Sequence, residues 1–194
     1  MRCGRTTEVT ELFNDPKTFG EQAVAGFSAA HSRYVQQVRG GVIRSTGSPK
    51  GRVALALGGV AGHDPASAGW VGPGLGHGAA CGNVFSSPSV VQVYSVARAA
   101  HQGGGVVLGF GNYAGDVLHF GQAAERLGRR HRRTRGCGSA MTLPPGPASD
   151  WSRRRGIAGD PVVFKVAGAA AEAGRATSFA FPMNAVGELL DRKP

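Results

Sequence analysis

The sequence is poor in the features that mark secreted or membrane-spanning proteins. It has three cysteines in 194 residues, an odd number without metal-ligand spacing, which argues against a disulfide framework or a zinc site. No apolar run approaches the roughly 20 residues needed to cross a bilayer. Residues 1–16 carry acids and lack the apolar core of a secretory signal. We therefore expect a cytoplasmic protein with reduced thiols and no membrane partner.

Aromatic and charged residues are also scarce, at 7% and 18%, whereas glycine is abundant, at 32 residues. Most of the glycines alternate with apolar runs, which favours tight strand-to-helix loops over flexible linkers. A hydrophobic content of 41% and this length suit one globular domain with a real core. We treat residues 1–194 as that single domain.

Positive charge is concentrated in one part of the chain. Residues 126–155 contain nine arginines and one acid, a net +8 of the chain's total of +10. Binding of nucleic acid through Arg126 to Arg135 is therefore one alternative, because arginine clusters neutralise phosphate backbones. The stretch lacks the interleaved aromatic residues of single-strand binders, and the rest of the chain is nearly neutral. We therefore do not expect a nucleic acid partner.

The segment 128–149 departs from the rest in composition. It is rich in Arg, Gly and Pro and has neither helical nor strand periodicity, where the alternation of elements would place another strand. We predict that it is disordered. Out-of-frame translation of a GC-rich gene between two compensating shifts is one hypothesis for its origin. Residues 175–194 are interpreted as a divergent tail.

The rest of the chain alternates between helical and strand patterns. Pro16 follows Asn14 and Asp15, which suits the opening of a helix, and the serine cluster before Val90 is a second start signal. The pattern predicts an α/β fold, in which strand–loop–helix units form a mixed or parallel sheet with flanking helices. The predicted helices lie near 16–34, 90–100, 117–127 and 162–173, and the predicted strands at 40–44, 53–57 and 106–110.

Two polar loops follow predicted strands. The first, a glycine-rich loop at 58–62, ends in His63, and the second carries Asp116 at a helix start. Ligands of open α/β sheets bind at the carboxyl ends of the strands, and glycine lets backbone N–H groups approach them closely. Simpler readings are an exposed histidine after a glycine turn, and an Asp116 that only caps its helix. If the two loops converge, they form a site for a small polar molecule.

Six motifs, in this order and spacing, resemble the N-terminal half of the substrate-binding subunit of dihydroxyacetone kinases. The similarity runs over about residues 12–127 and 149–174, and the reading Gly-Asn-Tyr-Ala-Gly-Asp is similar to the erythrulose kinase subgroup. The motifs are FNDP at 13–16, Gly-Gly-x-x-Gly-His-x-Pro at 58–65, VGPG at 71–74, CGNVFSSPS at 81–89, GNYAGDVLHF at 111–120 and RRGIAG at 154–159.

The resemblance implies roles for residues in both loops. His63 falls on the family's proton acceptor, and Asp116 on the aspartate that hydrogen-bonds the hydroxyls of a short-chain ketose and helps to activate one for phosphoryl transfer. The backbone of Val60, Ala61 and Gly62 falls on the segment that lines the substrate. Such chemistry needs a positioned substrate and an acceptor for the hydroxyl proton.

The sequence departs from the family in three respects. Val60 and Ala61 stand where the family usually has Gly and Ser, and Gly111 stands where common members carry a lysine. The family's second histidine, which holds the ketose as a hemiaminal, lies in a region downstream of Pro194. No other histidine of this chain lies in a matching context. The chain is therefore expected to be a truncated domain of the family.

The resemblance also implies partners. ATP with Mg²⁺, or a phosphoprotein, is expected as phosphoryl donor on a partner domain or subunit, with no cofactor or metal bound by this chain, and the family suggests a homodimer. The alternative is a catalytically inactive fragment, or a regulatory module that binds a ketose without turnover.

Overall fold

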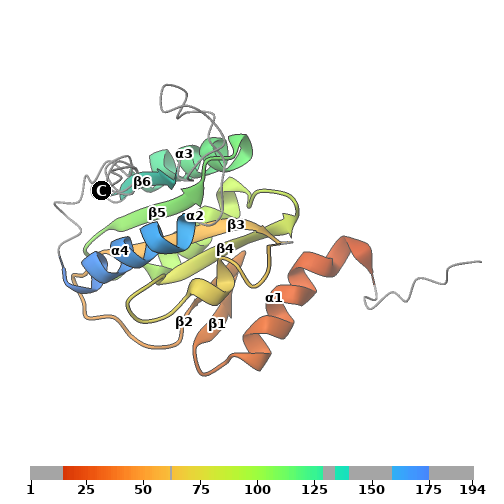
Figure 1. The fold of residues 1–194 in the computed structure, drawn as a ribbon, viewed down its shortest axis with the longest axis horizontal. Coiled ribbons are helices and arrows are strands. Elements are labelled where there is room, and N and C mark those ends of the chain that lie inside the picture. The colour runs from red at the N-terminus through yellow and green to blue at the C-terminus, as the bar shows by residue number, and fades with distance from the viewer. Residues whose placement is uncertain (1–14, 62, 129–133, 140–158, 175–194) are drawn as a thin grey trace, which may run out of the picture.

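The protein folds as a six-stranded mixed sheet between helices, in the strand order β1-β2-β4-β3-β5-β6 (Figure 1). The computed structural model describes residues 15–61, 63–128, 134–139 and 159–174. None of the helices in these ranges has the length and apolar character to span a bilayer. The strands are β1 Val35–Val38, β2 Gly41–Arg44, β3 Ala54–Ala61, β4 Gly78–Val84, β5 Val106–Gly111 and β6 Thr134–Ser139, and the α-helices are α1 Phe19–Ala30, α2 Val90–Ala100, α3 Ala114–Gly128 and α4 Asp160–Glu172.

Both faces of the central strand β3 are buried, which explains its continuous apolar run. Ala54 and Ala56 face the core formed with α2 and α3. Leu55 and Leu57 face the opposite core, against which α1 and α4 pack. The predicted α/β fold with a mixed sheet and flanking helices is confirmed.

Strands β4, β3, β5 and β6 run parallel, whereas β2 pairs antiparallel with β4, and β1 pairs antiparallel with β2 in a hairpin. The carboxyl ends of the parallel strands therefore meet at one edge of the sheet. Helices α3 and α4 begin near this edge in Figure 1. The loops that carry the predicted site residues thus emerge together.

Helix α2 begins where the serine cluster predicts. The side chain of Ser89 accepts a hydrogen bond from the backbone N–H of Gln92 at 3.3 Å, and Gln92 Oε1 accepts from the N–H of Ser89 at 2.8 Å. This capping box satisfies two N–H groups that a helix start leaves without partners.

The boundaries of two predicted segments are corrected. Strand β3 runs on to Ala61, so the first glycines of the presumed loop belong to the sheet. Residues 134–139 form β6, paired parallel with β5 from Thr134 to Ser139, so the prediction of disorder is wrong for this stretch. A strand pairs through backbone groups and needs no apolar period at the edge of a sheet, which is why periodicity missed it. The rest of 129–149 and the segment 175–194 lie outside the described residues.

A polar cluster joins the C-terminal end of α4 to the amino edge of the sheet, the edge opposite the carboxyl ends of the parallel strands. Glu172 pairs with Arg44, whose guanidinium also contacts Ser48. The N–H of Leu55 donates to Nδ1 of His77 at 3.1 Å, and Nε2 of that ring lies 3.7 Å from Oε1 of Glu172. Burial, together with the nearby Arg44, lowers the pKa of His77 to about 4.

Candidate functional site

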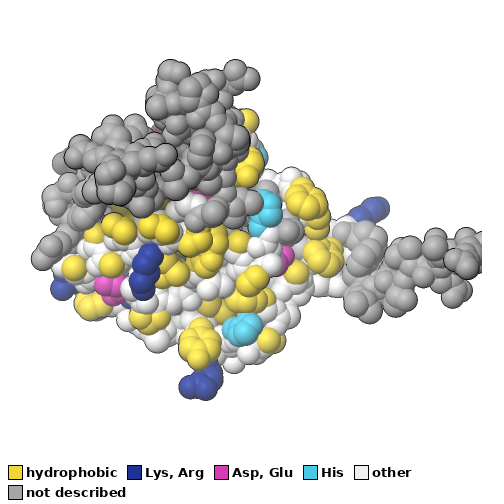
Figure 2. All heavy atoms as spheres, viewed as in Figure 1, with side chains coloured by type: hydrophobic (Ala, Val, Ile, Leu, Met, Phe, Trp, Pro, Cys, Tyr) yellow, Lys and Arg dark blue, Asp and Glu magenta, His cyan; other side chains and the backbone are white. Residues whose placement is uncertain are grey.

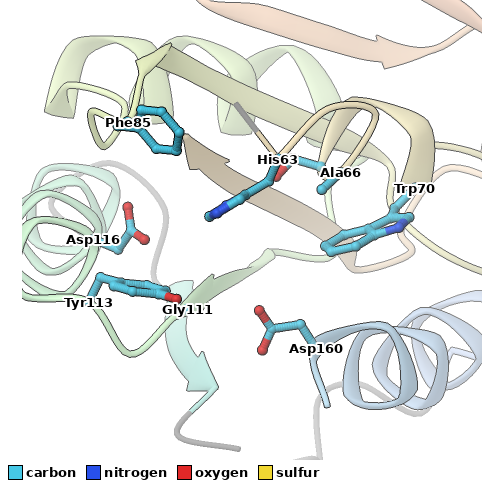
Figure 3. Close-up of a pocket in the computed structure, with 9 residues that line it drawn as sticks. His63, Ala66, Trp70, Phe85, Gly111, Tyr113, Asp116 and Asp160 are labelled. Carbon is cyan, nitrogen blue, oxygen red and sulfur yellow. The ribbon is translucent and has the colours of Figure 1, made fainter. Parts of the chain in front are cut away.

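A cavity of about 250 Å³ lies at the carboxyl edge of the sheet (Figure 3). Its walls come from the ends of β3, β4 and β5 and from the starts of α3 and α4. The volume lies below the range typical of drug-sized ligands, so the cavity suits a small molecule. The lining residues are His63, Ala66, Ser67, Trp70, Phe85, Gly111, Tyr113, Asp116 and Asp160.

His63 follows β3 and reaches the cavity as predicted. Its backbone carbonyl accepts a hydrogen bond from the N–H of Ala66 at 2.8 Å, which tightens the turn that carries the ring. The imidazole extends toward Asp116 in Figure 3 and meets the ring of Phe85 edge to face, with centroids 6.2 Å apart. The histidine is therefore held by its turn and by one aromatic neighbour.

Asp116 lies in the first turn of α3 and is only 2% exposed. Burial raises the pKa of its carboxyl group, against the opposing effects of a hydrogen bond from Ser87 and of the His119 and His63 imidazoles. Its Oδ1 atom is buried without a hydrogen-bond partner among the described residues. A buried acceptor without a partner is unusual in a folded protein and calls for an explanation, which a hydrogen bond from a ligand would supply.

Gly111, the last residue of β5, lies beneath the ring of Tyr113. A Cβ at this position would lie 3.0 and 3.1 Å from two ring carbons of Tyr113, and 3.8 Å from Oδ2 of Asp160. The glycine therefore lets Tyr113 pack against the strand end, and a side chain here would also come into contact with Asp160.

The structure brings together three of the predicted site residues, His63, Gly111 and Asp116, in one cavity. Val60 and Ala61 contribute backbone to β3, and Gly62 lies outside the described residues. The predicted role of these three in lining a substrate therefore stays a prediction.

Several lining residues were not predicted from the sequence. Phe85 and Tyr113 lie within motifs that carry the family resemblance, so their position in a motif was the available signal. Trp70 and Ser67 gave no pattern of their own. Asp160 reads in the sequence as an ordinary acid at a helix start, before Pro161, and only the fold brings it to the cavity.

The described residues contain no cluster of protein ligands that could hold a metal ion by themselves. Within the described ranges, no group of three His, Cys, Asp or Glu side chains is arranged to hold one. Of the other described histidines, His77 is buried in the cluster at the opposite edge, and Nδ1 of His119 lies 3.0 Å from the carbonyl oxygen of Pro88. We therefore assign no described residue to Mg²⁺ and derive no step through it.

Arg126, the first residue of the candidate nucleic-acid stretch, serves the packing of helices. Its guanidinium lies 4.3 Å from the ring centroid of Tyr94 and so joins α3 to α2. On the face drawn in Figure 2, the Lys and Arg side chains of the described residues stand singly and form no patch. Residues 129–133 lie outside the described residues.

The fold and the site define an α/β domain with a small polar cavity at the carboxyl edge of its sheet. Within that class, the chain belongs to the Dak1 domain family, which matches residues 25–179.

Named relatives agree with this assignment. The chain is 55% identical over 166 residues to an L-erythrulose 1-kinase of Mycolicibacterium smegmatis, covering 86% of this chain and 29% of the relative. It is 38% identical to the dihydroxyacetone-binding subunit DhaK of a PTS-dependent dihydroxyacetone kinase of Listeria innocua, covering 84% of this chain and 50% of the relative. The dihydroxyacetone kinase of C. freundii, solved with AMP-PNP and Mg²⁺, superposes with a TM-score of 0.75 at 31% identity, over 88% of this chain and 34% of that one. The chain thus spans between 29% and 50% of the length of these relatives.

Proposed function

We propose that this chain is the substrate-binding part of a ketose kinase, which positions a short-chain ketose of the dihydroxyacetone or erythrulose type for phosphoryl transfer. The observation that carries the proposal is the pairing of His63 with the buried Asp116 in one small cavity. The unpartnered Oδ1 of Asp116 supplies an acceptor for a sugar hydroxyl. The erythrulose and dihydroxyacetone kinases among the relatives support this substrate class.

In the proposed reaction, a ketose hydroxyl lies between the two side chains. Asp116 accepts a hydrogen bond from the ketose and orients it, and a ring nitrogen of His63 takes the proton of the reacting hydroxyl. A bond forms between that oxygen and the transferred phosphorus, while the bond between the phosphorus and its donor breaks. In this proposal the chain positions the ketose and accepts the proton of its reacting hydroxyl, and phosphoryl transfer requires both.

The phosphoryl donor, ATP or a phosphoprotein, is supplied by a partner in this proposal. The Listeria relative is described as a subunit of a PTS-dependent kinase, and the C. freundii enzyme was solved with an ATP analogue, so relatives of both kinds support a separate donor site. We further propose a homodimer, which light scattering on the purified chain would test, and a cytoplasmic location, in keeping with the free thiol of Cys81.

The direct test has two steps. Calorimetry with dihydroxyacetone and L-erythrulose should give binding to the wild-type chain and much weaker binding to Asp116→Ala. Addition of the donor subunit of a relative, with ATP or phosphoprotein, should then give phosphorylated ketose in a reaction that His63→Ala abolishes. Absence of ketose binding by a folded wild-type chain would refute the proposal.

One observation favours a second candidate, a module that binds ketose without turnover. Of the histidines in the described ranges, His63 is the one that lines the cavity. The covalent histidine that the family resemblance implies therefore has no counterpart in the described part of the site. Ketose binding that leaves no borohydride-trapped adduct, with no phosphorylation by either donor, would favour this candidate.

A further inference from the structure

A second carboxylate enters the cavity from helix α4. Asp160 is 6% exposed and belongs to the first turn of this helix, some forty residues beyond Asp116 in the sequence. In Figure 3 its carboxylate points into the cavity, and Tyr113 and Gly111 lie between it and Asp116. The cavity therefore has an acid at each of two ends.

The position of Asp160 is fixed by close packing of α4. One turn further along the helix, Phe164 packs against Trp70, a lining residue, with ring centroids 5.8 Å apart. Phe164 also lies so close to β5 that a Cβ on Gly109 would stand 2.8 Å from its ring. A side chain on a helix held in this way presents its carboxylate with little freedom, as a selective site requires.

The space in front of Asp160 depends on a missing side chain. A Cβ on Gly111 would reach to 3.8 Å from Oδ2 of Asp160 and would press on the Tyr113 ring. Because no atom stands there, a ligand that reaches beyond His63 and Asp116 can approach the second carboxylate.

We propose that Asp160 is a specificity-determining residue, whose carboxylate accepts a hydrogen bond from the distal hydroxyl of a ketose with four or more carbons. The inference rests on the proposed function. It adds that the distal end of the ketose is recognised, and that the Asp160 carboxylate recognises it. A three-carbon ketose held at His63 and Asp116 lacks the additional carbon and hydroxyl that would reach this end. A site built to bond a hydroxyl discriminates strongly against an analogue that lacks it.

The charge of the cavity agrees with a neutral polyol. A carboxylate in the first turn of a helix is stabilised by the free N–H groups there, and Asp160 holds this position in α4. Together with Asp116 it makes the cavity attractive to hydroxyl donors and unfavourable for anions. An anionic sugar acid should therefore bind less well than the neutral ketose.

A purely structural role for Asp160 is the competing interpretation. The side chain has a further interaction within the protein, and an acid at a helix start stabilises the helix. With such a role, substitution of Asp160 lowers the melting temperature and weakens the binding of all ketoses by the same factor. With a role in specificity, the substitution changes the ratio of the affinities for two ketoses, and a loss of stability alone does not change this ratio.

The test compares two ketoses on matched variants of the full chain. Calorimetric affinities for L-erythrulose and dihydroxyacetone are measured for wild type, Asp160→Ala, Asp160→Asn and the control Glu21→Gln, an exposed first-turn acid of α1. We expect Asp160→Ala to weaken erythrulose binding about tenfold to a hundredfold, with dihydroxyacetone changed less than about threefold. Asp160→Asn keeps an acceptor oxygen without the charge and should fall between wild type and Asp160→Ala, and Glu21→Gln should leave both affinities unchanged.

Gly111→Ala provides a second variant if Asp160→Ala does not fold. Its methyl group would press on the Tyr113 ring, which lies between Asp116 and Asp160, and would lie at contact distance from Oδ2, so erythrulose should again lose more affinity than dihydroxyacetone. An unchanged ratio of the two affinities in the folded Asp160 and Gly111 variants overturns the assignment of Asp160 alone. Failure of the wild-type chain to bind either ketose overturns the proposed function instead.

Discussion

The rings of His63 and Phe85 meet edge to face, with centroids 6.2 Å apart, although Phe85 is 74% exposed. Phe85 also has a positive φ of 50°, a backbone conformation that L residues other than Asn and Asp seldom adopt. A large apolar side chain in an unfavourable conformation, kept at the mouth of a cavity, indicates a role in the site. The ring shields one side of the imidazole and restricts its motion.

Replacing Phe85 with Ala should therefore weaken ketose binding more than it affects folding. An aromatic pair contributes about 0.5–1.5 kcal/mol, and where that energy holds the imidazole in its binding position, its removal corresponds to a two- to twelvefold loss of affinity. The melting temperature should change little, because the side chain is exposed. Calorimetry and thermal unfolding measure the two effects, with Leu118→Ala, an exposed residue of α3 that does not line the cavity, as control. Equal affinities in wild type and Phe85→Ala would contradict this role.

Asp116→Asn should abolish ketose phosphorylation and yet stabilise the fold. Burial raises the pKa of the Asp116 carboxyl, so ionisation of this group costs stability. The amide has the same shape and carries no charge, and we expect a gain of about 0.5–2 kcal/mol in the free energy of unfolding. Urea unfolding at pH 7 would measure the gain, and a destabilised Asp116→Asn would show that the carboxylate is well compensated in the fold.

Gly58→Ala should destabilise the protein through the packing of α3. A Cβ on this strand residue would overlap Cζ of Phe120, which is fully buried. Overpacking of this kind costs about 1–3 kcal/mol. Gly121→Ala is the matched control, because a Cβ there meets nothing within 4 Å, and it should stabilise the helix by about 0.5–1 kcal/mol. Opposite signs in urea unfolding are the expected result, and a neutral Gly58→Ala would mean that Phe120 moves freely.

Mild acid should destabilise the fold through His77. Its pKa is about 4 in the folded chain and about 6.5 in the unfolded chain, so the unfolded chain binds more protons between these values. The stabilising contribution is complete above about pH 6.5, decreases as the pH falls and is absent below about pH 4. Between pH 7 and pH 5 the loss should be about 2 kcal/mol.

The variant that checks this effect is His77→Asn, whose Oδ1 can take the place of Nδ1 as acceptor for the Leu55 N–H. The difference in free energy of unfolding between pH 7 and pH 5 should shrink in the variant. The same pH dependence in both proteins would assign the acid sensitivity to other groups.

Much of the architecture follows from the sequence where periodicity and start signals coincide. Helix α2 was predicted at its observed bounds, because the serine before Val90 and the apolar spacing both point to them. Strand β1 was missed because four residues with two exposed glutamines carry too short a pattern. Strand β6 was missed because its composition resembles a loop and its backbone pairing with β5 leaves no trace in the sequence.

The site was predictable only in part. His63 follows strand β3, and Asp116 lies in the first turn of the helix that follows β5, so the rule for ligands of α/β sheets brings them to one edge. Asp160 follows a segment without any predicted element, and its approach to the cavity depends on how α4 crosses the sheet. The role of Gly58 was interpreted as freedom of a turn, whereas the structure assigns it to contact with a buried aromatic ring.

Helix α4 carries Asp160 in its first turn and ends at Glu172, which pairs with Arg44 at the amino edge of the sheet, opposite the cavity. The C-terminal end of the helix is thus held by the Arg44–Glu172 pair, and its N-terminal end places the Asp160 carboxylate at the cavity. On the proposal that Asp160 selects the ketose, Arg44 of the β1–β2 hairpin would influence that choice through α4, without any contact with the sugar. Substitution of Arg44 would then be a remote means of adjusting the choice of substrate.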